Sequence, residues 1–226
     1  AGIALGARCT VSDILASPLL AERAPSLVEA SRNFAGQMVR NAATIGGNIA
    51  CGSPAADLVP PLLALDAELD LLGPGGARRV PLADYYTGYK KDVRRPDEII
   101  ARVLLPAPAA PRRDLFYKLA RRQGDAITVV GVAVSVAMSG GNCAGVRIAL
   151  ASVAPVPMRA RKAEARLEGR PPSAALIAEA ADAAMAECAP IDDIRASAGY
   201  RRTMVGVLTR RLLAEALAPH TQERSN

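Results

Sequence analysis

Aromatic side chains are scarce in this sequence: they make up 3% of its 226 residues, and there is no Trp. Proteins that bind single-stranded nucleic acid generally stack its bases on exposed aromatic rings. The composition therefore argues against that class of protein. Half of the residues are hydrophobic, which is enough for one large core or two small ones and suits a cofactor carrier or a subunit.

Residues that bind metals or act as nucleophilic pairs are also few. The four cysteines, Cys9, Cys51, Cys143 and Cys188, form no C-x-x-C pair, and His220 is the single histidine. This spacing argues against a local iron–sulfur or zinc site and against a Ser-His-Asp triad. We expect no metal site and no catalytic residue on this chain, with its thiols reduced as in the cytoplasm.

Long apolar runs and blocks of one charge are missing as well. No run approaches the ~20 apolar residues that span a bilayer, and no charged-then-apolar leader opens the sequence. The net charge is +6, but the basic residues come in scattered pairs such as Arg78-Arg79 and Lys90-Lys91. This pattern favours a solvated surface, or a face for an acidic protein or an anionic cofactor. A basic nucleic-acid binder stays a third hypothesis, and it rests on net charge alone.

The first half of the sequence reads as alternating helices and strands. We expect a strand over 2–7 and a helix over 12–20, capped by Ser12 and ended by Pro18. Pro25 opens a second helix, and a short proline-containing helix covers 58–67. Residues 67–73 alternate as in a half-buried strand, "GPGGA" makes a hairpin turn, and 97–106 form a further strand.

The stretch from Pro106 to Asp114 is the one linker-like segment in mid-chain, so we predict domains over 1–106 and 107–226. In the second, 126–138 and 144–153 form a hairpin of a three-stranded antiparallel sheet. Helices follow over 173–189 and 197–217, the latter with Arg201, Arg202, Arg210 and Arg211 mostly outside. The expected fold class is α+β: a mixed sheet with flanking helices, then a small antiparallel sheet packed on helices.

The glycine-rich stretch "NAATIGGNIACGSPAADL", residues 41–58, carries the clearest chemical signal. Gly46 and Gly47 permit positive φ and consecutive exposed N–H groups, a concavity that binds phosphate. Thr44 and Asn48 add a hydroxyl and an amide, while Ser53 and Asp57 form a second polar cluster that can bond ribityl or sugar hydroxyls. A tight turn with no ligand remains the alternative, because neither G-x-G-x-x-G nor a P-loop is present.

Around these glycines, "NFAGQMVRNAATIGGNIACGSPAADLVPPLLALDAELDLL" resembles the flavin-binding subunit or domain of the molybdenum hydroxylases. That family includes xanthine dehydrogenase, aldehyde oxidase and aerobic carbon monoxide dehydrogenase. The resemblance continues through "LADYYTGYKKDVRRPDEIIARVLLP", "FYKLARRQGDAITVVGVAV" and "DIRASAGYRRTMVGVLTRRLL", so it covers nearly the whole chain. It implies the fold of the family, an FAD-binding PCMH-like subdomain followed by a CO dehydrogenase flavoprotein-like C-terminal domain.

The resemblance further implies FAD on this chain. Carried over residue by residue, the cofactor-binding positions are Phe34 and Ala35 in the nucleotide cleft, Thr44, Gly46, Gly47 and Asn48 at the pyrophosphate, Ser53 and Asp57 at hydroxyls, Lys90, Ile100 against a ring, and Lys118 near the isoalloxazine. Each has a plainer interpretation: Phe34 as core, Lys90 and Lys118 as solvated charges, and Asp57 as a helix cap. Cys51 is expected to be a small filler.

The implied function is that of a flavoprotein subunit of an oxidoreductase. Electrons from two 2Fe-2S clusters on a partner subunit pass through FAD to an acceptor, and a third subunit carries the molybdopterin cofactor. We expect a dimer of such heterotrimers, without a membrane span. The alternative is a truncated docking subunit that binds no FAD.

Relatives normally carry, upstream of the segment that matches "GIALGA", a subdomain with its own Gly-Gly-Thr phosphate loop, which this sequence does not contain. The sequence is a fragment, or another chain supplies that part, or the part is lost. In each case we expect these 226 residues alone to bind FAD weakly.

Overall fold

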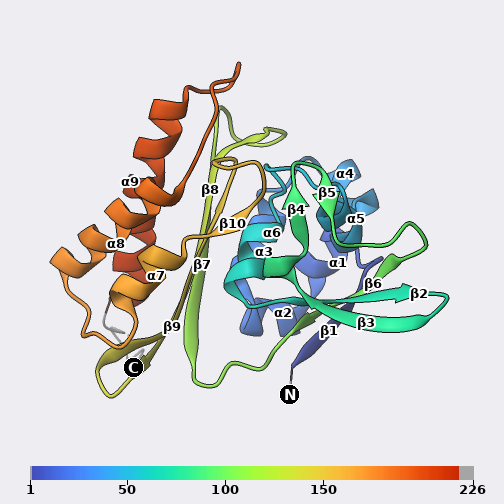
Figure 1. The fold of residues 1–226 in the computed structure, drawn as a ribbon, viewed down its shortest axis with the longest axis horizontal. Coiled ribbons are helices and arrows are strands. Elements are labelled where there is room, and N and C mark those ends of the chain that lie inside the picture. The colour runs from blue at the N-terminus through green and yellow to red at the C-terminus, as the bar shows by residue number, and fades with distance from the viewer. Residues whose placement is uncertain (1, 219–226) are drawn as a thin grey trace, which may run out of the picture.

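The structure is a computed structural model that describes residues 2–218, so His220 lies outside the described residues. In these residues, two four-stranded sheets lie side by side with helices between and around them (Figure 1). The first sheet has the order β1-β6-β2-β3 and the second the order β10-β9-β8-β7. The α+β class predicted from the sequence is confirmed.

The first sheet takes its strands from both ends of the first half of the chain. Its members are β1 (Ile3–Gly6), β6 (Ile99–Leu105), β2 (Glu68–Gly73) and β3 (Gly76–Pro81). The predicted hairpin joins β2 to β3. In the described residues every strand pair of this sheet is antiparallel, so the expected mixture of parallel and antiparallel pairs is wrong. A short hairpin of β4 (Tyr86–Gly88) and β5 (Lys91–Asp92), preceded by a 3-10 turn over Leu82–Asp84, stands apart from it.

Six short helices fill the first half between its strands. They are α1 (Val11–Ala16), α2 (Pro18–Arg23), α3 (Pro25–Arg32), α4 (Gln37–Ala42), α5 (Ile45–Ala50) and α6 (Val59–Ala64). Pro25 opens α3 as predicted. The single helix expected over 12–20 is wrong: Thr10 caps α1, and Pro18 begins α2 because the first helical position needs no N–H from its residue.

The glycine-rich segment also differs from the expectation. Gly46 and Gly47 lie in the first turn of α5, and neither has positive φ. The Thr44 side chain caps this helix by accepting a bond of 3.1 Å from the Gly47 N–H. The predicted loop with positive φ is therefore wrong, because this segment forms a helix instead. The Thr44 hydroxyl, which was expected to serve a ligand, caps that helix.

The second sheet is sandwiched between two layers of helices (Figure 1). Its strands are β7 (Arg112–Ala120), β8 (Thr128–Ser139), β9 (Asn142–Ala151) and the two-residue β10 (Met158–Arg159), so it has four strands where three were predicted. On one face, Val130, Val132 and Val134 pack against α7 (Arg161–Leu167), α8 (Ala174–Glu187) and α9 (Ala198–Leu217).

The opposite face of this sheet packs against the first half of the chain. It is lined by small residues, among them Gly131, Ala133 and Ala149, so α6 and α3 approach closely. Phe116, Ala133 and Ala149 belong to the same hydrophobic core as the first sheet. The two halves thus share a core even though, in the described residues, no strand pair links their sheets.

Two carboxylates, the buried Asp114 and the exposed Asp66, fix the two halves against each other. Asp114 on β7 accepts a bond of 2.9 Å from the Ser26 N–H at the start of α3. Asp66, after α6, pairs at 2.8 Å with both Arg147 and Arg159. The domain boundary near 106, in the linker that joins β6 to β7, stays a prediction. The interface between the two halves is where the candidate site lies.

Candidate functional site

A cavity of about 830 Å³ opens between the two halves of the chain. The first half contributes the turn after α3, the loop between α5 and α6, and the turn between β4 and β5. The second half contributes the end of β7, the segments before β8 and after β9, and the chain that leads into α9. The lining residues that matter below are Phe34, Ala35, Asn48, Ser53, Asp57, Lys90, Lys118, Ile127, Ser152, Pro155, Asp193, Arg195 and Arg201.

A buried ion pair crosses the cavity between the halves. The Lys118 ammonium lies 2.7 Å from the Asp57 carboxylate and also donates to the Asn33 carbonyl at 3.0 Å. The other Asp57 oxygen accepts a hydrogen bond from the Thr128 hydroxyl. Burial raises the pKa of Asp57, while the charge of Lys118 opposes that rise. Both side chains are at most 10% exposed, so this pair joins the halves and places a cation at the cavity wall.

A second buried cation lies on the opposite side, at the start of α9. Arg201 donates to the carbonyls of Val129 and Ser152 at 2.9 Å each and pairs with Asp193 at 2.6 Å. Burial alone would raise the pKa of Asp193, but hydrogen bonds from Arg195 and Arg201 hold that pKa well below its ordinary value. Asp193 is therefore an ionised carboxylate that orients both guanidinium groups.

Two loops of the first half touch at the cavity rim with unusual backbone angles. Gly52 has φ +60°, and Lys90, facing it, has φ +52°. A Cβ at Gly52 would lie 2.9 Å from the Lys90 Cα. Glycine is thus required at position 52 both by its left-handed φ and by the approach of the second backbone.

We expect Gly52→Ala to lower the free energy of unfolding by about 2 kcal/mol, from left-handed strain plus the displaced Lys90 loop. Urea unfolding measures the change. Gly75→Ala is the matched control, because Gly75 has no positive φ and its Cβ would meet nothing within 4 Å. Equal stability of the two variants would contradict the close approach of these loops.

Seven of the eleven predicted cofactor-binding residues line this one cavity: Phe34, Ala35, Asn48, Ser53, Asp57, Lys90 and Lys118. They come from segments up to 84 positions apart (118 minus 34), so the fold brings them together. Ala35 has φ 36°, an unusual value for a residue with a side chain, at the mouth of the cavity. The structure also shows that Asp57 caps no helix by its side chain; its oxygens serve Lys118 and Thr128.

The other four predicted residues lie elsewhere. Ile100 is 8% exposed, pairs with Leu71 in the first sheet and belongs to the hydrophobic core. Thr44, Gly46 and Gly47 form the far end of α5, whose six residues are ~9 Å long.

At that end of α5, the first N–H groups already have acceptors. The Gly46 N–H bonds to the Ala7 carbonyl at 2.9 Å, and the Ile45 N–H bonds to the Cys9 carbonyl at 2.9 Å. Gly47 remains exposed, and a Cβ there would meet only the Thr44 hydroxyl at 2.9 Å. The consecutive free N–H groups expected at this position are therefore not present. What the structure offers instead is the exposed backbone of Gly47, which no side chain covers.

Sequence reasoning missed the contribution of the segment before and within α9. Arg201 was expected on the outside of the helix, yet it is 2% exposed. The "DIRASAGYRR" stretch that carries the resemblance, with Asp193, Arg195 and Arg201, marked the segment but not the burial of Arg201. Nothing local separates Arg201 from its exposed neighbour Arg202, because its partners lie 72 and 49 positions earlier in the chain.

The cavity has the size and the lining that suit a flavin cofactor. Its volume falls within the ~300–1,000 Å³ usual for cofactor sites, with Phe34, Ile127 and Pro155 among its apolar walls. The buried Arg201 Nε has no hydrogen-bond acceptor in residues 2–218, which leaves a donor for a ligand in a residue of the wall. Over the same residues, no group of three or more Cys, His, Asp or Glu side chains is arranged to hold a metal ion.

Comparison with known proteins assigns both halves to described families. Residues 1–108 match the family described as the FAD binding domain in molybdopterin dehydrogenase, and residues 115–216 match the CO dehydrogenase flavoprotein C-terminal domain. The chain is 36% identical to the carbon monoxide dehydrogenase medium chain of Hydrogenophaga pseudoflava, over 96% of this chain and 75% of that one. It is 30% identical to a putative xanthine dehydrogenase FAD-binding subunit of Escherichia coli, over 95% and 74%.

Solved structures agree with these relatives. A carbon monoxide dehydrogenase of Hydrogenophaga pseudoflava that lacks the Mo-pyranopterin moiety superposes with a TM-score of 0.91 at 37% identity, over 95% of this chain and 75% of that one. Quinoline 2-oxidoreductase from Pseudomonas putida 86 superposes with a TM-score of 0.86 at 29% identity, over 96% and 75%. The sequence matches and the fold matches each cover about three quarters of the relative's length.

Proposed function

The chain belongs to the FAD-binding subunits of the molybdenum hydroxylase family, and from this membership we propose that its interdomain cavity holds the flavin of FAD. Members of this family are subunits of oxidoreductases, and the chain is such an electron-transferring flavoprotein subunit. The observation that carries the proposal is the convergence of seven family-predicted residues on one cavity of about 830 Å³.

When bound, FAD would take up and release electrons one or two at a time, and the protein would bind it and set the charge around it. In this proposal Phe34 and Ile127 give apolar surface to the ring system. Lys118 and Arg201 are buried cations held at the cavity wall by carboxylates, Lys118 by the buried Asp57 and Arg201 by the partly exposed Asp193. A fixed positive charge beside the flavin favours its electron-rich, reduced form.

We place the phosphate end of the cofactor along α5, beyond the cavity. Asn48 lines the cavity, while Gly47 lies exposed one residue earlier at the capped end. An elongated dinucleotide can therefore touch the cavity and pass over the bare Gly47 backbone. Thr44 and Gly46 then act by shaping this end of the helix, since their polar groups are already bonded within the protein.

Replacing Lys90 by Gln tests this placement. Lys90 is exposed and lines the cavity, and no ion pair is found for it in the described residues. We expect Lys90→Gln to weaken FAD binding about three- to tenfold at low salt, because a cation near the dianionic pyrophosphate is worth on the order of 1 kcal/mol in water. Flavin fluorescence titration measures the affinity.

Lys91→Gln provides the control for this experiment. Lys91 is exposed and adjacent in sequence, but it does not line the cavity, so its variant should bind FAD as the wild type does. Equal losses in both variants would mean that general surface charge attracts the cofactor. The absence of any flavin binding by a folded chain would favour the second candidate, a docking subunit without FAD.

The partners proposed for the chain follow from the family. We propose that it works beside an iron–sulfur subunit and a molybdopterin-binding subunit, as a dimer of heterotrimers in the cytoplasm. The relatives named above include medium chains and a FAD-binding subunit, which supports a multi-subunit assembly. No helix among the described residues has the length and apolar character needed to cross a bilayer. Analytical ultracentrifugation of the purified native complex would give its subunit stoichiometry.

A further inference from the structure

Three further cavities lie end to end along one strand, β7. The first, of about 900 Å³, and the second, of about 420 Å³, share Pro25, Asp114 and Leu115. The second and a third of about 580 Å³ share Glu29, Phe116 and Tyr117. Because neighbouring cavities share wall residues, they follow one another along the strand from Arg112 to Ala120, and the row is here called the β7 groove.

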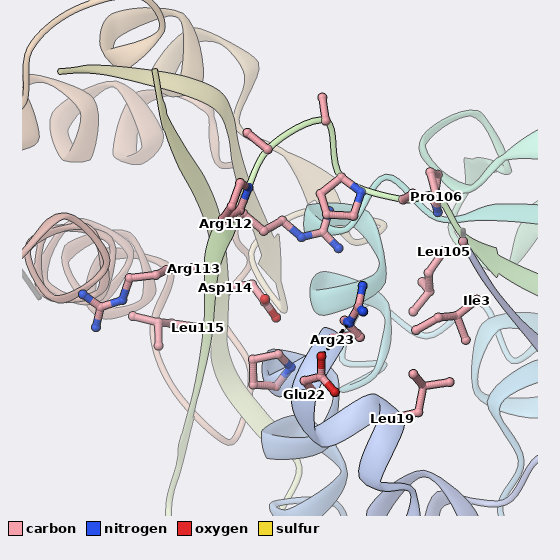
Figure 2. A pocket seen from close by; sticks show the side chains of 17 residues that line it. Ile3, Leu19, Glu22, Arg23, Leu105, Pro106, Arg112, Arg113, Asp114 and Leu115 are labelled. Atoms are coloured by element: carbon pink, nitrogen blue, oxygen red, sulfur yellow. Dashed lines mark hydrogen bonds and ion pairs between the residues drawn. The ribbon is translucent and has the colours of Figure 1, made fainter. Parts of the chain in front are cut away.

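The groove occupies the place where a next strand of the second sheet would lie. β7 is the last strand in the order β10-β9-β8-β7, so one of its edges has no partner strand. Helix α3 covers one face of the sheet beside β7, and α9 covers the other. In Figure 2, Arg112 and Asp114 point to one side of the strand, and Arg113 and Leu115 point to the other. The helices therefore wall the groove, and the edge of β7 forms its floor.

The register identifies which backbone groups face the groove. On β9, the Ile148 N–H bonds to Glu164 and its carbonyl accepts from Ala160, both on the side away from β8. Its partner on β8, Val134, must then direct its backbone groups toward β7, where it pairs with Leu115.

Since directions alternate along a strand, the N–H and C=O groups of Arg112, Asp114, Phe116 and Lys118 point into the groove. In residues 2–218, no backbone group of β7 bonds to any element except β8. Up to eight strong hydrogen-bonding groups thus line one open edge, spaced for an extended peptide backbone.

The charge of the groove selects the kind of peptide. Two of its carboxylates are paired with neighbouring arginines, Glu22 with Arg23 and Glu29 with Arg32. Among the described residues, five guanidinium groups along it have no carboxylate within ion-pair distance: Arg112, Arg113, Arg121, Arg122 and Arg211. Arg211 instead lies over the Tyr117 ring at 5.3 Å. Asp114 and Glu215 are the other carboxylates of the lining, so the five arginines still leave the walls with an excess of positive charge.

We propose that the β7 groove binds an extended acidic segment of a partner polypeptide, which adds to β7 as a fifth strand of the second sheet. Main-chain bonds to the edge give affinity and alternate side chains give selectivity, as in other cases of strand addition. Acidic side chains of the added strand reach Arg113 and Arg211 on the α9 side and Arg112 on the α3 side. The groove lies beside the proposed flavin cavity and shares Lys118 and Ala126 with it. The inference does not depend on flavin binding, because it is drawn from the open strand edge and the arginines along it.

The probe is a fluorescein-labelled synthetic peptide of eleven alternating Thr and Glu residues, measured by fluorescence anisotropy with the full chain. Two comparison peptides carry Lys in place of Glu, or Pro in place of every Thr. We expect the Thr-Glu peptide to bind with an affinity that falls as salt rises. The Thr-Lys peptide should not bind, and the Pro-containing acidic peptide should bind at least tenfold more weakly, since its Pro residues have no N–H to donate to the edge.

Charge reversal locates the peptide on the protein. The double variant Arg113→Glu/Arg211→Glu should weaken Thr-Glu binding at least tenfold, whereas Arg161→Glu should not change it. Arg161 is exposed at the start of α7, away from the groove. Hydrogen exchange should show new protection at the Asp114 and Phe116 amides and none at Leu115 or Tyr117, which already bond to β8.

Three results would overturn the proposal. The first is no binding of the Thr-Glu peptide at low salt. The second is equal binding of the Pro-containing peptide, which would leave only a diffuse attraction of charges. A DNA duplex that displaces the peptide and shows the same sensitivity to charge reversal would make the groove a general polyanion surface.

Discussion

Replacing Lys118 by Met is expected to lower the free energy of unfolding by about 3–5 kcal/mol at pH 7. The Lys118 side chain is 5% exposed, and its ammonium is the cation paired with the buried Asp57 carboxylate. Without it, one Asp57 oxygen faces a methionine side chain, and the carboxylate is either an unpaired buried charge or must take up a proton. The variant also removes the bond to the Asn33 carbonyl.

The pH dependence of this loss has a definite sign. Burial already raises the pKa of Asp57, and removing Lys118 removes the charge that opposes the rise. A carboxyl group whose pKa is higher in the folded state binds its proton more tightly there. Its contribution to stability is complete below the unfolded pKa of ~3.9 and is lost as pH rises through the folded pKa. The deficit of Lys118→Met should therefore grow from pH 4 to pH 7.

Urea unfolding at these pH values checks the prediction, and a double variant supplies the control. Asp57→Asn/Lys118→Met removes both charges while keeping an amide for the Thr128 hydroxyl. It should recover most of the lost stability and show little pH dependence between pH 4 and pH 7. A deficit in Lys118→Met that does not change with pH would mean that lost packing, rather than the unpaired carboxylate, causes it.

The parts of the fold that the sequence predicted well are those set by neighbouring residues. Pro25 at the start of α3 and the glycine turn between β2 and β3 depend on local backbone preferences alone. Pro18 misled because a proline that cannot continue one helix is well suited to begin the next. The sequence permits both outcomes, and the Ser17 cap decides between them.

Strand β7 was not predicted because both of its faces are covered. Asp114, Phe116 and Lys118 face the first half of the chain, while Leu115 and Tyr117 pack toward α9. The alternation of apolar and polar residues that marks a half-buried strand is therefore absent. A buried Asp and a buried Lys look like surface residues in the sequence, and only the partners Ser26 and Asp57 explain them.

The site residues predicted from the sequence differ from those that were missed in how local their signal is. The positions Phe34 to Asp57 and Lys118 belong to short motifs that resemble a family, so they could be named before the fold was known. Asp193 and Arg201 carry the opposite wall of the cavity, but a buried arginine in a helix rich in surface arginines has no local signature. Its interpretation needs the carbonyls of Val129 and Ser152.

Alanine at the two adjacent glycines of α5 should affect different properties: stability at Gly46 and cofactor binding at Gly47. A Cβ at Gly46 would lie 2.6 Å from the Ala7 Cβ and 2.8 Å from the Ala7 carbonyl oxygen. Since the oxygen belongs to backbone that also accepts the Gly46 N–H, neither side can move without losing that bond. We expect Gly46→Ala to cost about 3 kcal/mol, at the upper end of what overpacking usually costs.

Gly47→Ala should leave the free energy of unfolding within about 1 kcal/mol of the wild type, because the gain in helix propensity offsets pressure on the Thr44 cap. Its expected effect is on the cofactor, since the added methyl group projects from the exposed end of α5 where the phosphates are proposed to pass. Urea unfolding and flavin titration of both variants separate the two roles. If Gly47→Ala binds FAD as tightly as the wild type, this end of α5 only shapes the fold, and the phosphates must be held elsewhere.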